Sequence, residues 1–154
     1  MGRPNPNEVE IILYHANCSD GFGAAWAAWK LLGSKAKYIA CKHGAPPPDV
    51  TGKNVAICDF SFDNATTKQM IEDANSLVIL DHHKSAVVEL HDISEAIFDM
   101  NHSGAVITWK FFHPGKEPPK LLNLIEDRDL WKWDISYSEE FSAYFDMVPF
   151  DFEE

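Results

Sequence analysis

The sequence has few cysteines and no long apolar segment. No uncharged apolar run reaches the roughly 18 residues that cross a bilayer, and residues 1–10 are polar and proline-containing, unlike a signal peptide. Three cysteines are present, an odd number lying in or beside apolar runs, which predicts reduced thiols and not a disulfide framework. These absences predict a soluble, cytoplasmic protein that has no membrane partner.

Basic residues are also scarce. The chain has 13 Lys and Arg against 24 Asp and Glu, so its formal net charge is -11. Proteins hold long nucleic acids with clustered Lys and Arg, and this charge balance opposes such a partner. Any nucleic-acid substrate should therefore be short, or be held by metal ions, and the sequence predicts no particular oligomeric state.

The amino-acid composition of the chain is that of one globular domain. Hydrophobic residues make up 45% and charged residues 24% of the 154 positions, which excludes disorder and suits a single packed domain. Short apolar runs alternate with segments of helical spacing, which predicts an α/β fold: an open, mostly parallel five-stranded sheet with helices on both faces. The expected strands span residues 8–14, 36–41, 54–58, 77–80 and 96–98, and the expected helices span residues 23–32, 65–74, 103–112 and 120–131.

Residue types that bind metals follow four of the expected strands. Asp often follows a strand because it caps the next helix or turn, but capping does not call for histidine. Imidazole together with carboxylate is a ligand mixture that Mn²⁺, Fe²⁺ or Zn²⁺ accepts. Since ligands of such sheets bind at the carboxyl ends of the strands, we expect a metal site there. The residues are His15, Asp20, Asp59, Asp81, His82, His83, Asp99 and His102.

The string Asp81-His82-His83, which follows an apolar run, resembles the signature of the DHH phosphoesterase superfamily. Its members include RecJ-like exonucleases, nano-RNases, cyclic-dinucleotide phosphodiesterases and family II pyrophosphatases. Three further segments resemble the other motifs and stand in the family order: residues 15–26, 56–60 and 125–131. The resemblance covers residues 9–135 and implies the N-terminal lobe of this family alone.

The resemblance also implies a site with two divalent ions, usually Mn²⁺, with Mg²⁺, Co²⁺ or Zn²⁺ as other candidates. Asp59 is then expected to bridge the ions, Asp81 to orient an imidazole, and His83 to face the substrate phosphate as electrophile or proton donor. The implied metal ligands are His15, Asp20, Asp59, His82 and Asp127. The expected substrate contacts are Gly21, Ser103, Gly104 and Arg128, although Ser103 is equally well explained as a helix N-cap.

Two positions leave alternatives open. Asp127 and Asp129 cannot both face the metals from one helix; helical phase favours Asp129, whereas the family motif matches Asp127, which we choose. RecJ-like members carry a carboxylate where this chain has Cys18. This thiol is either a thiolate ligand, which would favour Zn²⁺ or Fe²⁺, or a protonated group beside a weak first metal site. We expect the second, because no basic residue in the nearby sequence lowers its pKa.

The function implied by the resemblance is that of a metal-dependent phosphohydrolase. Its partner would be a small phosphorylated substrate or a short oligonucleotide. It would cleave a phosphodiester of short oligonucleotides or cyclic nucleotides by attack of a metal-bridging hydroxide. The alternatives are an exopolyphosphatase-like hydrolase of phosphoanhydrides and a non-catalytic module that binds metal or phosphate. The C-terminal substrate-binding lobe of two-lobed members is not found after residue 135, so we expect residues 1–154 to form a single domain, either a fragment or a single-lobe protein.

Overall fold

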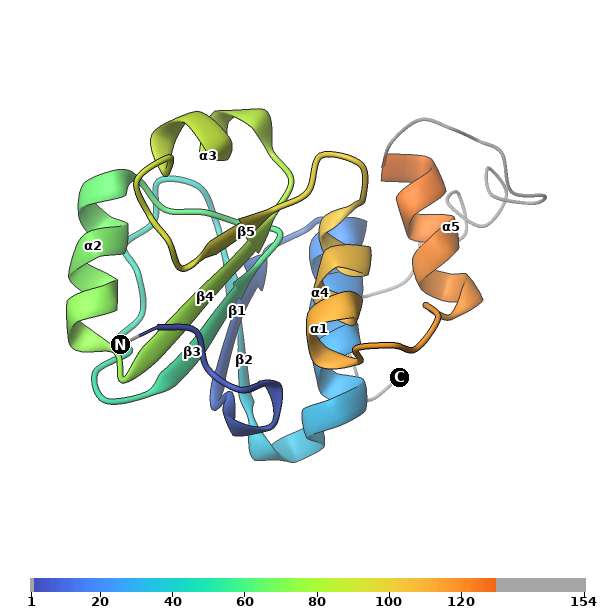
Figure 1. The fold of residues 1–154 in the computed structure, drawn as a ribbon, viewed down its shortest axis with the longest axis horizontal. Helices are drawn as coiled ribbons and strands as arrows, with labels where there is room; N and C mark the ends of the chain where they lie inside the picture. Colours follow the sequence, from blue (N-terminus) through green and yellow to red (C-terminus); the bar gives the residue numbers. More distant parts are fainter. Residues whose placement is uncertain (1, 130–154) are drawn as a thin grey trace.

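A parallel sheet forms the centre of the computed structural model, which describes residues 2–129 (Figure 1). Its five strands lie in the order β2-β1-β3-β4-β5, and every pair is parallel. The predicted α/β fold is confirmed, and the sheet is entirely, not mostly, parallel. Residues 130–154 of the expected domain lie outside the described residues. The strands are β1 (Ile11–His15), β2 (Lys37–Cys41), β3 (Asn54–Cys58), β4 (Ser76–Asp81) and β5 (Ala96–Phe98).

Helices cover both faces of the sheet. Helices α1 (Ser19–Leu32) and α4 (Gly104–Phe112) pack on one face, and α2 (Asn64–Asp73) and α3 (Lys84–Glu89) lie on the other (Figure 1). Helix α5 (Lys120–Asp129) packs on the outer side of α1 and α4, and two short 3-10 turns are η1 (Pro6–Glu8) and η2 (Gly33–Lys35). None of the helices in the described part of the chain has the length and apolar character of a membrane span.

The central strands are apolar throughout because both of their faces are covered. Alternate side chains of β4 enter two separate cores: Val78 and Leu80 pack toward α1 and α4, while Leu77 and Ile79 pack on the opposite face. All four are at most 1% exposed. The sheet is therefore a rigid support for the polar residues that follow its strands.

The helices differ from the prediction at the start of α1 and by the presence of α3. Helix α1 begins at Ser19, four residues before the predicted start at residue 23, so that Gly21 lies inside the helix and not before it. Glycine disfavours a helix interior in isolation, and only packing against the sheet makes this early start favourable. Helix α3 was not predicted, because its six residues are too few to show a helical period.

Helices α1, α4 and α5 meet at Gly23. A β-carbon at this position would lie 2.9 Å from Cδ1 of Ile125 and 3.0 Å from Cβ of Ala105. The alanines of α1 are buried beside it, which lets the helix backbones approach closely. This contact brings the first turns of α1 and α4 together at the carboxyl edge of the sheet.

Gly23→Val is expected to lower the free energy of unfolding by about 1–3 kcal/mol, because a branched side chain overpacks this junction. Urea unfolding measures the change. Ala65→Val on the exposed part of α2 is the matched control, since it carries only the lower helix propensity of valine. An equal loss of stability in both variants would contradict the packing account.

Candidate metal centre

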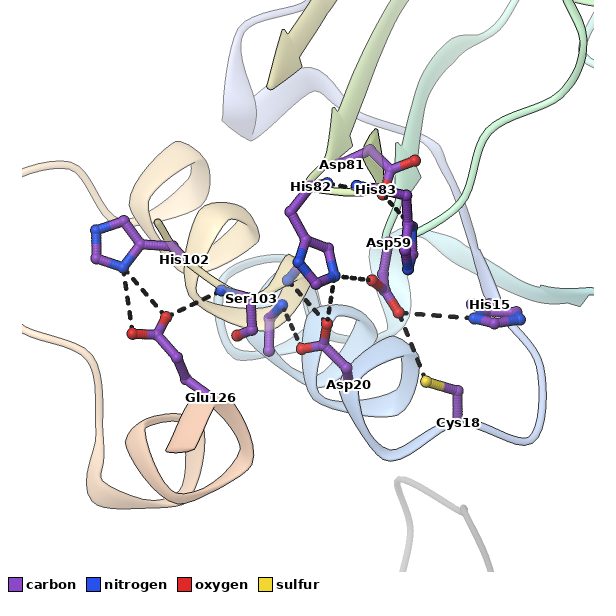
Figure 2. Close-up of polar contacts among 12 residues, drawn as sticks. His15, Cys18, Asp20, Asp59, Asp81, His82, His83, His102, Ser103 and Glu126 are labelled. Atoms are coloured by element: carbon purple, nitrogen blue, oxygen red, sulfur yellow. Dashed lines mark hydrogen bonds and ion pairs between the residues drawn. The ribbon is translucent and has the colours of Figure 1, made fainter. Parts of the chain in front are cut away.

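Carboxylate, imidazole and thiol side chains converge at the carboxyl ends of β1, β3 and β4 (Figure 2). One comes from the end of β1, one follows β3, three end or follow β4, and two come from the start of α1. The parallel order of the sheet is the reason, because it places these strand ends at one edge. The residues are His15, Asp59, Asp81, His82, His83, Cys18 and Asp20.

Asp59 occupies the middle of this cluster. It directly follows β3 in a left-handed conformation with φ of 57°, which Asp tolerates better than most residues, and it is 1% exposed. Its Oδ1 lies 3.1 Å from Nε2 of His82, whereas its Oδ2 lies 3.8 Å from Nδ1 of His15 and 3.7 Å from Sγ of Cys18. The two oxygens of one carboxylate therefore serve two different sets of neighbours.

Asp20 is held by the first turn of α4. The backbone N–H of Gly104 donates to its Oδ2 at 2.8 Å and the N–H of Ala105 donates to its Oδ1 at 2.9 Å. These N–H groups have no partner within the helix itself, and they lie at its positive end, where a carboxylate is stabilised. Oδ2 also lies 3.2 Å from Nε2 of His82, so this imidazole nitrogen is shared by Asp20 and Asp59.

Two glycines make the close approach of these segments possible. A β-carbon on Gly104 would lie 2.5 Å from Cβ and Oδ1 of Asp59, and one on Gly21 would clash with the carbonyl oxygen of His15. Both glycines are buried in the described structure. The structure gives them a packing role, and the contact with substrate expected for them stays a prediction.

The shared imidazole and the carboxylates perturb one another. Burial opposes protonation of His82, but its hydrogen bonds to Asp20 and Asp59 outweigh burial and raise its pKa to about 11. Burial and the charge of Asp59 raise the pKa of Asp20 to about 6. Burial also disfavours the ionised form of Asp59, yet the nearby imidazole of His15 and the hydrogen bond from His82 lower its pKa below the usual value. Without a metal, the cluster is held together by a proton on His82.

Asp81 orients the second histidine of the triplet. Its Oδ1 accepts hydrogen bonds from Nδ1 of His83 at 2.7 Å and from the backbone N–H of His82 at 2.8 Å. Its Oδ2 accepts from the Ser61 hydroxyl at 2.6 Å. The hydrogen bond to Asp81 raises the pKa of His83, whose side chain is 44% exposed and borders a cavity of about 350 Å³.

The donor set fits a divalent cation. Asp59, Asp81, His82 and His83 each offer a ligand atom, and these atoms lie within 4.8 Å of one another. His15, Cys18 and Asp59 form a second such group. Nδ1 of His15 is buried and has no hydrogen-bond partner in the described part of the chain, as expected of an atom that a cation would satisfy. This buried cluster could therefore bind a metal ion.

Cys18 is the N-cap of α1 and points at Asp59. Burial, and next the charge of Asp59, raise the pKa of its thiol to about 12. The thiol is thus protonated at neutral pH in the metal-free protein. Because a bound cation would itself lower this pKa, both alternatives for Cys18 stay predictions.

The last of the motif-like segments, which we call the late motif (residues 125–131), begins on α5. Asp127 is 3% exposed and follows buried Leu124 by three positions, so it lies on the buried side of the helix. Asp127 is therefore buried, although the helical phase favoured Asp129 as the residue that faces the metals. The side chains of Arg128 and Asp129 lie outside the described residues, so the substrate contact expected of Arg128 and the comparison with Asp129 stay predictions.

Sequence reasoning did not assign a role to Glu126. Its carboxylate accepts hydrogen bonds from the backbone N–H of Ser103 at 3.0 Å and from Nδ1 of His102 at 3.1 Å (Figure 2). Ser103 caps α4, since its hydroxyl accepts from the N–H of Val106. The pairing joins segments 23 positions apart, and no short motif marks it.

Comparison with known proteins supports the fold. No family model matches the sequence. An uncharacterized protein of Acanthamoeba polyphaga mimivirus is 37% identical over 166 residues, which cover 96% of this chain and 39% of that protein. The crystal structure of an uncharacterized protein from Helicobacter pylori superposes with a TM-score of 0.64 at 15% identity, over 82% of this chain and 45% of that one. This chain spans less than half the length of either protein, and the superposition shows a shared fold.

The shared proton on His82 predicts a pH dependence for the metal-free protein. Because its folded pKa of about 11 exceeds the ordinary value of 6.5, its stabilisation is complete below pH 6.5 and is lost as pH rises toward 11. Between about pH 7 and 9 the free energy of unfolding should fall by at most about 1.4 kcal/mol per pH unit. Urea unfolding in EDTA measures this slope.

His82→Gln should remove the slope, whereas His91→Gln, at an exposed histidine, should leave it unchanged. A wild-type protein whose stability is flat over this range would contradict the assignment of the shared proton.

Proposed function

We propose that this chain is a metal-dependent phosphoesterase of the DHH type. The observation that carries the proposal is the sharing of Nε2 of His82 by two buried carboxylates, Asp20 and Asp59. The second oxygen of Asp59 faces His15. Such a carboxylate, with different donors at each of its oxygens, suits a bridge between two cations, as the resemblance in the sequence implies.

His15, Asp20, Asp59 and His82 would hold the ions, joined by Asp127 from α5. The oxygen and imidazole donors favour Mn²⁺, with Mg²⁺, Co²⁺ or Zn²⁺ as other candidates. Divalent ions bound there would lower the pKa of a water molecule and neutralise negative charge on the reacting phosphate.

The remaining chemistry belongs to Asp81 and His83. Asp81 accepts a hydrogen bond from Nδ1 of His83, which leaves Nε2 of that ring as the atom available to a substrate in the neighbouring cavity. The raised pKa of His83 favours its protonated form. His83 is therefore suited to donate a proton from Nε2 to the leaving oxygen, while Asp81 keeps the ring in place.

The cavity beside His83 favours a phosphodiester over a polyphosphate. Its lining includes the carboxylates of Asp63 and Glu89 together with Ser61 and Ser85, and no Lys or Arg is among the described residues that line it. A chain of further phosphates would meet negative charge there, whereas a sugar or base would find hydrogen-bonding groups. We therefore propose short oligonucleotides or cyclic nucleotides as substrates, and exopolyphosphatase activity as the weaker alternative.

The test is hydrolysis of a short RNA or of bis-p-nitrophenyl phosphate with and without Mn²⁺. Asp59→Asn removes the charge and tolerates the left-handed backbone, and His82→Ala removes the shared imidazole. Each should lower Mn²⁺-dependent turnover by more than roughly 10–100-fold, which is the cost of losing a residue that only hydrogen-bonds to a metal ligand. Circular dichroism should show an intact fold.

Asp73→Asn and His91→Ala are matched controls at exposed positions and should retain activity. Hydrolysis that persists in both site variants would refute the proposal. Mn²⁺ binding by the wild type without any hydrolysis would favour a non-catalytic module instead.

Cys18 gives a separate prediction about the metals. Because its thiol is protonated and lies 3.7 Å from Asp59, Cys18→Asp should increase Mn²⁺ affinity and Mn²⁺-dependent hydrolysis, and Cys18→Ser should change both little. Titration calorimetry measures the affinities. Loss of activity in Cys18→Ser, or a sulfur-to-metal charge-transfer band when Co²⁺ is added to the wild type, would instead identify Cys18 as a ligand.

A further inference from the structure

The first turn of α4 has every early backbone N–H satisfied by a side chain. The N–H of Ser103 donates to Glu126, those of Gly104 and Ala105 donate to Asp20, and that of Val106 donates to the hydroxyl of Ser103. A helix start normally leaves such donors to a cap or to water. Here carboxylates from two other helices, α1 and α5, complete the cap.

This turn is also the support on which both central carboxylates rest. Asp20 is bound by two of its N–H groups, at 2.8 and 2.9 Å. Asp59 packs directly against Gly104, where even a β-carbon would not fit. A displacement of the first turn of α4 would therefore move Asp20 and Asp59 relative to His82.

Glu126 holds the same turn from the outer side. Its Oε2 accepts from the N–H of Ser103 at 3.0 Å and from Nδ1 of His102 at 3.1 Å. The other ring nitrogen of His102, Nε2, accepts from Nζ of Lys110 at 2.9 Å, which fixes the ring. Figure 2 shows Glu126 and Asp20 on opposite sides of Ser103. The carboxylate of Glu126 is thus part of a network that fixes α5 to the start of α4.

We propose that Glu126 is a positioning residue of the metal centre, acting through the first turn of α4 on Asp20 and Asp59. It also fixes α5 next to Asp127, the neighbouring residue on that helix. This inference rests on the proposed function, since it assumes that the centre binds metal. It assigns a second role to the late motif, in which Glu126 sets the position of the ligands and takes no part in binding the ion.

The experiment measures Mn²⁺ affinity by titration calorimetry, together with kcat and KM, in wild type, Glu126→Ala and Glu126→Gln. Glu126→Ala should weaken Mn²⁺ binding by about 10–100-fold, the range found when outer partners of metal ligands are removed, and lower kcat without raising KM. Glu126→Gln keeps an oxygen that can accept from the N–H of Ser103 and should recover most of the affinity. Glu117→Ala, at an exposed glutamate before α5, is the control and should match the wild type.

A second readout does not depend on metal. In the metal-free protein, amide hydrogen exchange at Gly104 and Ala105 should be faster in Glu126→Ala than in wild type, because the cap that orders these donors is incomplete. If Glu126→Ala does not fold, His102→Ala, which leaves the contact with Ser103 in place, is measured instead. It is expected to weaken Mn²⁺ binding several-fold.

The outcomes separate this inference from the proposed function. If Glu126→Ala binds Mn²⁺ with the affinity of the wild type, the positioning role alone is overturned. The same holds for His102→Ala if that variant is the one measured. A variant that loses thermal stability but keeps its Mn²⁺ affinity and kcat would overturn it in the same way. A wild type that binds no Mn²⁺ would refute the proposed function, and the positioning role with it.

Discussion

Two buried carboxylates and the imidazole between them are the constraint on which the rest of the site depends. Asp20 and Asp59 are at most 1% exposed, and their ionised forms would repel one another without compensation. The compensation has two sources: a proton on His82 and the backbone N–H groups at the start of α4. A cation can replace the proton on His82, whereas the N–H groups are a fixed part of the backbone. A cation that replaced the proton would relieve the same repulsion, so metal binding is expected to release a proton from His82.

Close packing makes this electrostatic arrangement possible. Gly21, Gly23 and Gly104 each stand where a β-carbon would meet a neighbour at 3.0 Å or less. They let α1 pass beside β1 and let the start of α4 contact Asp59. The neighbours are the His15 backbone, the side chains of Ala105 and Ile125, and Asp59 itself. The carboxylates therefore occupy positions fixed by helices and a sheet, which suits a centre that needs accurate geometry.

The sequence was informative where a feature is local. The run before Asp81 predicted β4, and the alternation of apolar runs with helical spacing predicted a parallel sheet whose strand ends carry the acidic and imidazole groups. The early start of α1 escaped prediction because tertiary packing, and not propensity, makes a glycine-containing first turn helical. Glu126 escaped because its partners lie 23 and 24 positions away and only the packing of α5 brings them together.

The strand order has one further consequence for where a ligand can enter. From β1 the chain runs outward to β2 at one edge, and from β3 it runs through β4 to β5 at the other, so the connections leave β1 and β3 in opposite directions. Helix α1 follows β1 onto one face, and α2 follows β3 onto the other. A crevice at this topological switch point follows from the winding of the chain itself. His15 and Asp59 stand at its two sides, so the fold supplies the opening and these side chains supply its chemistry.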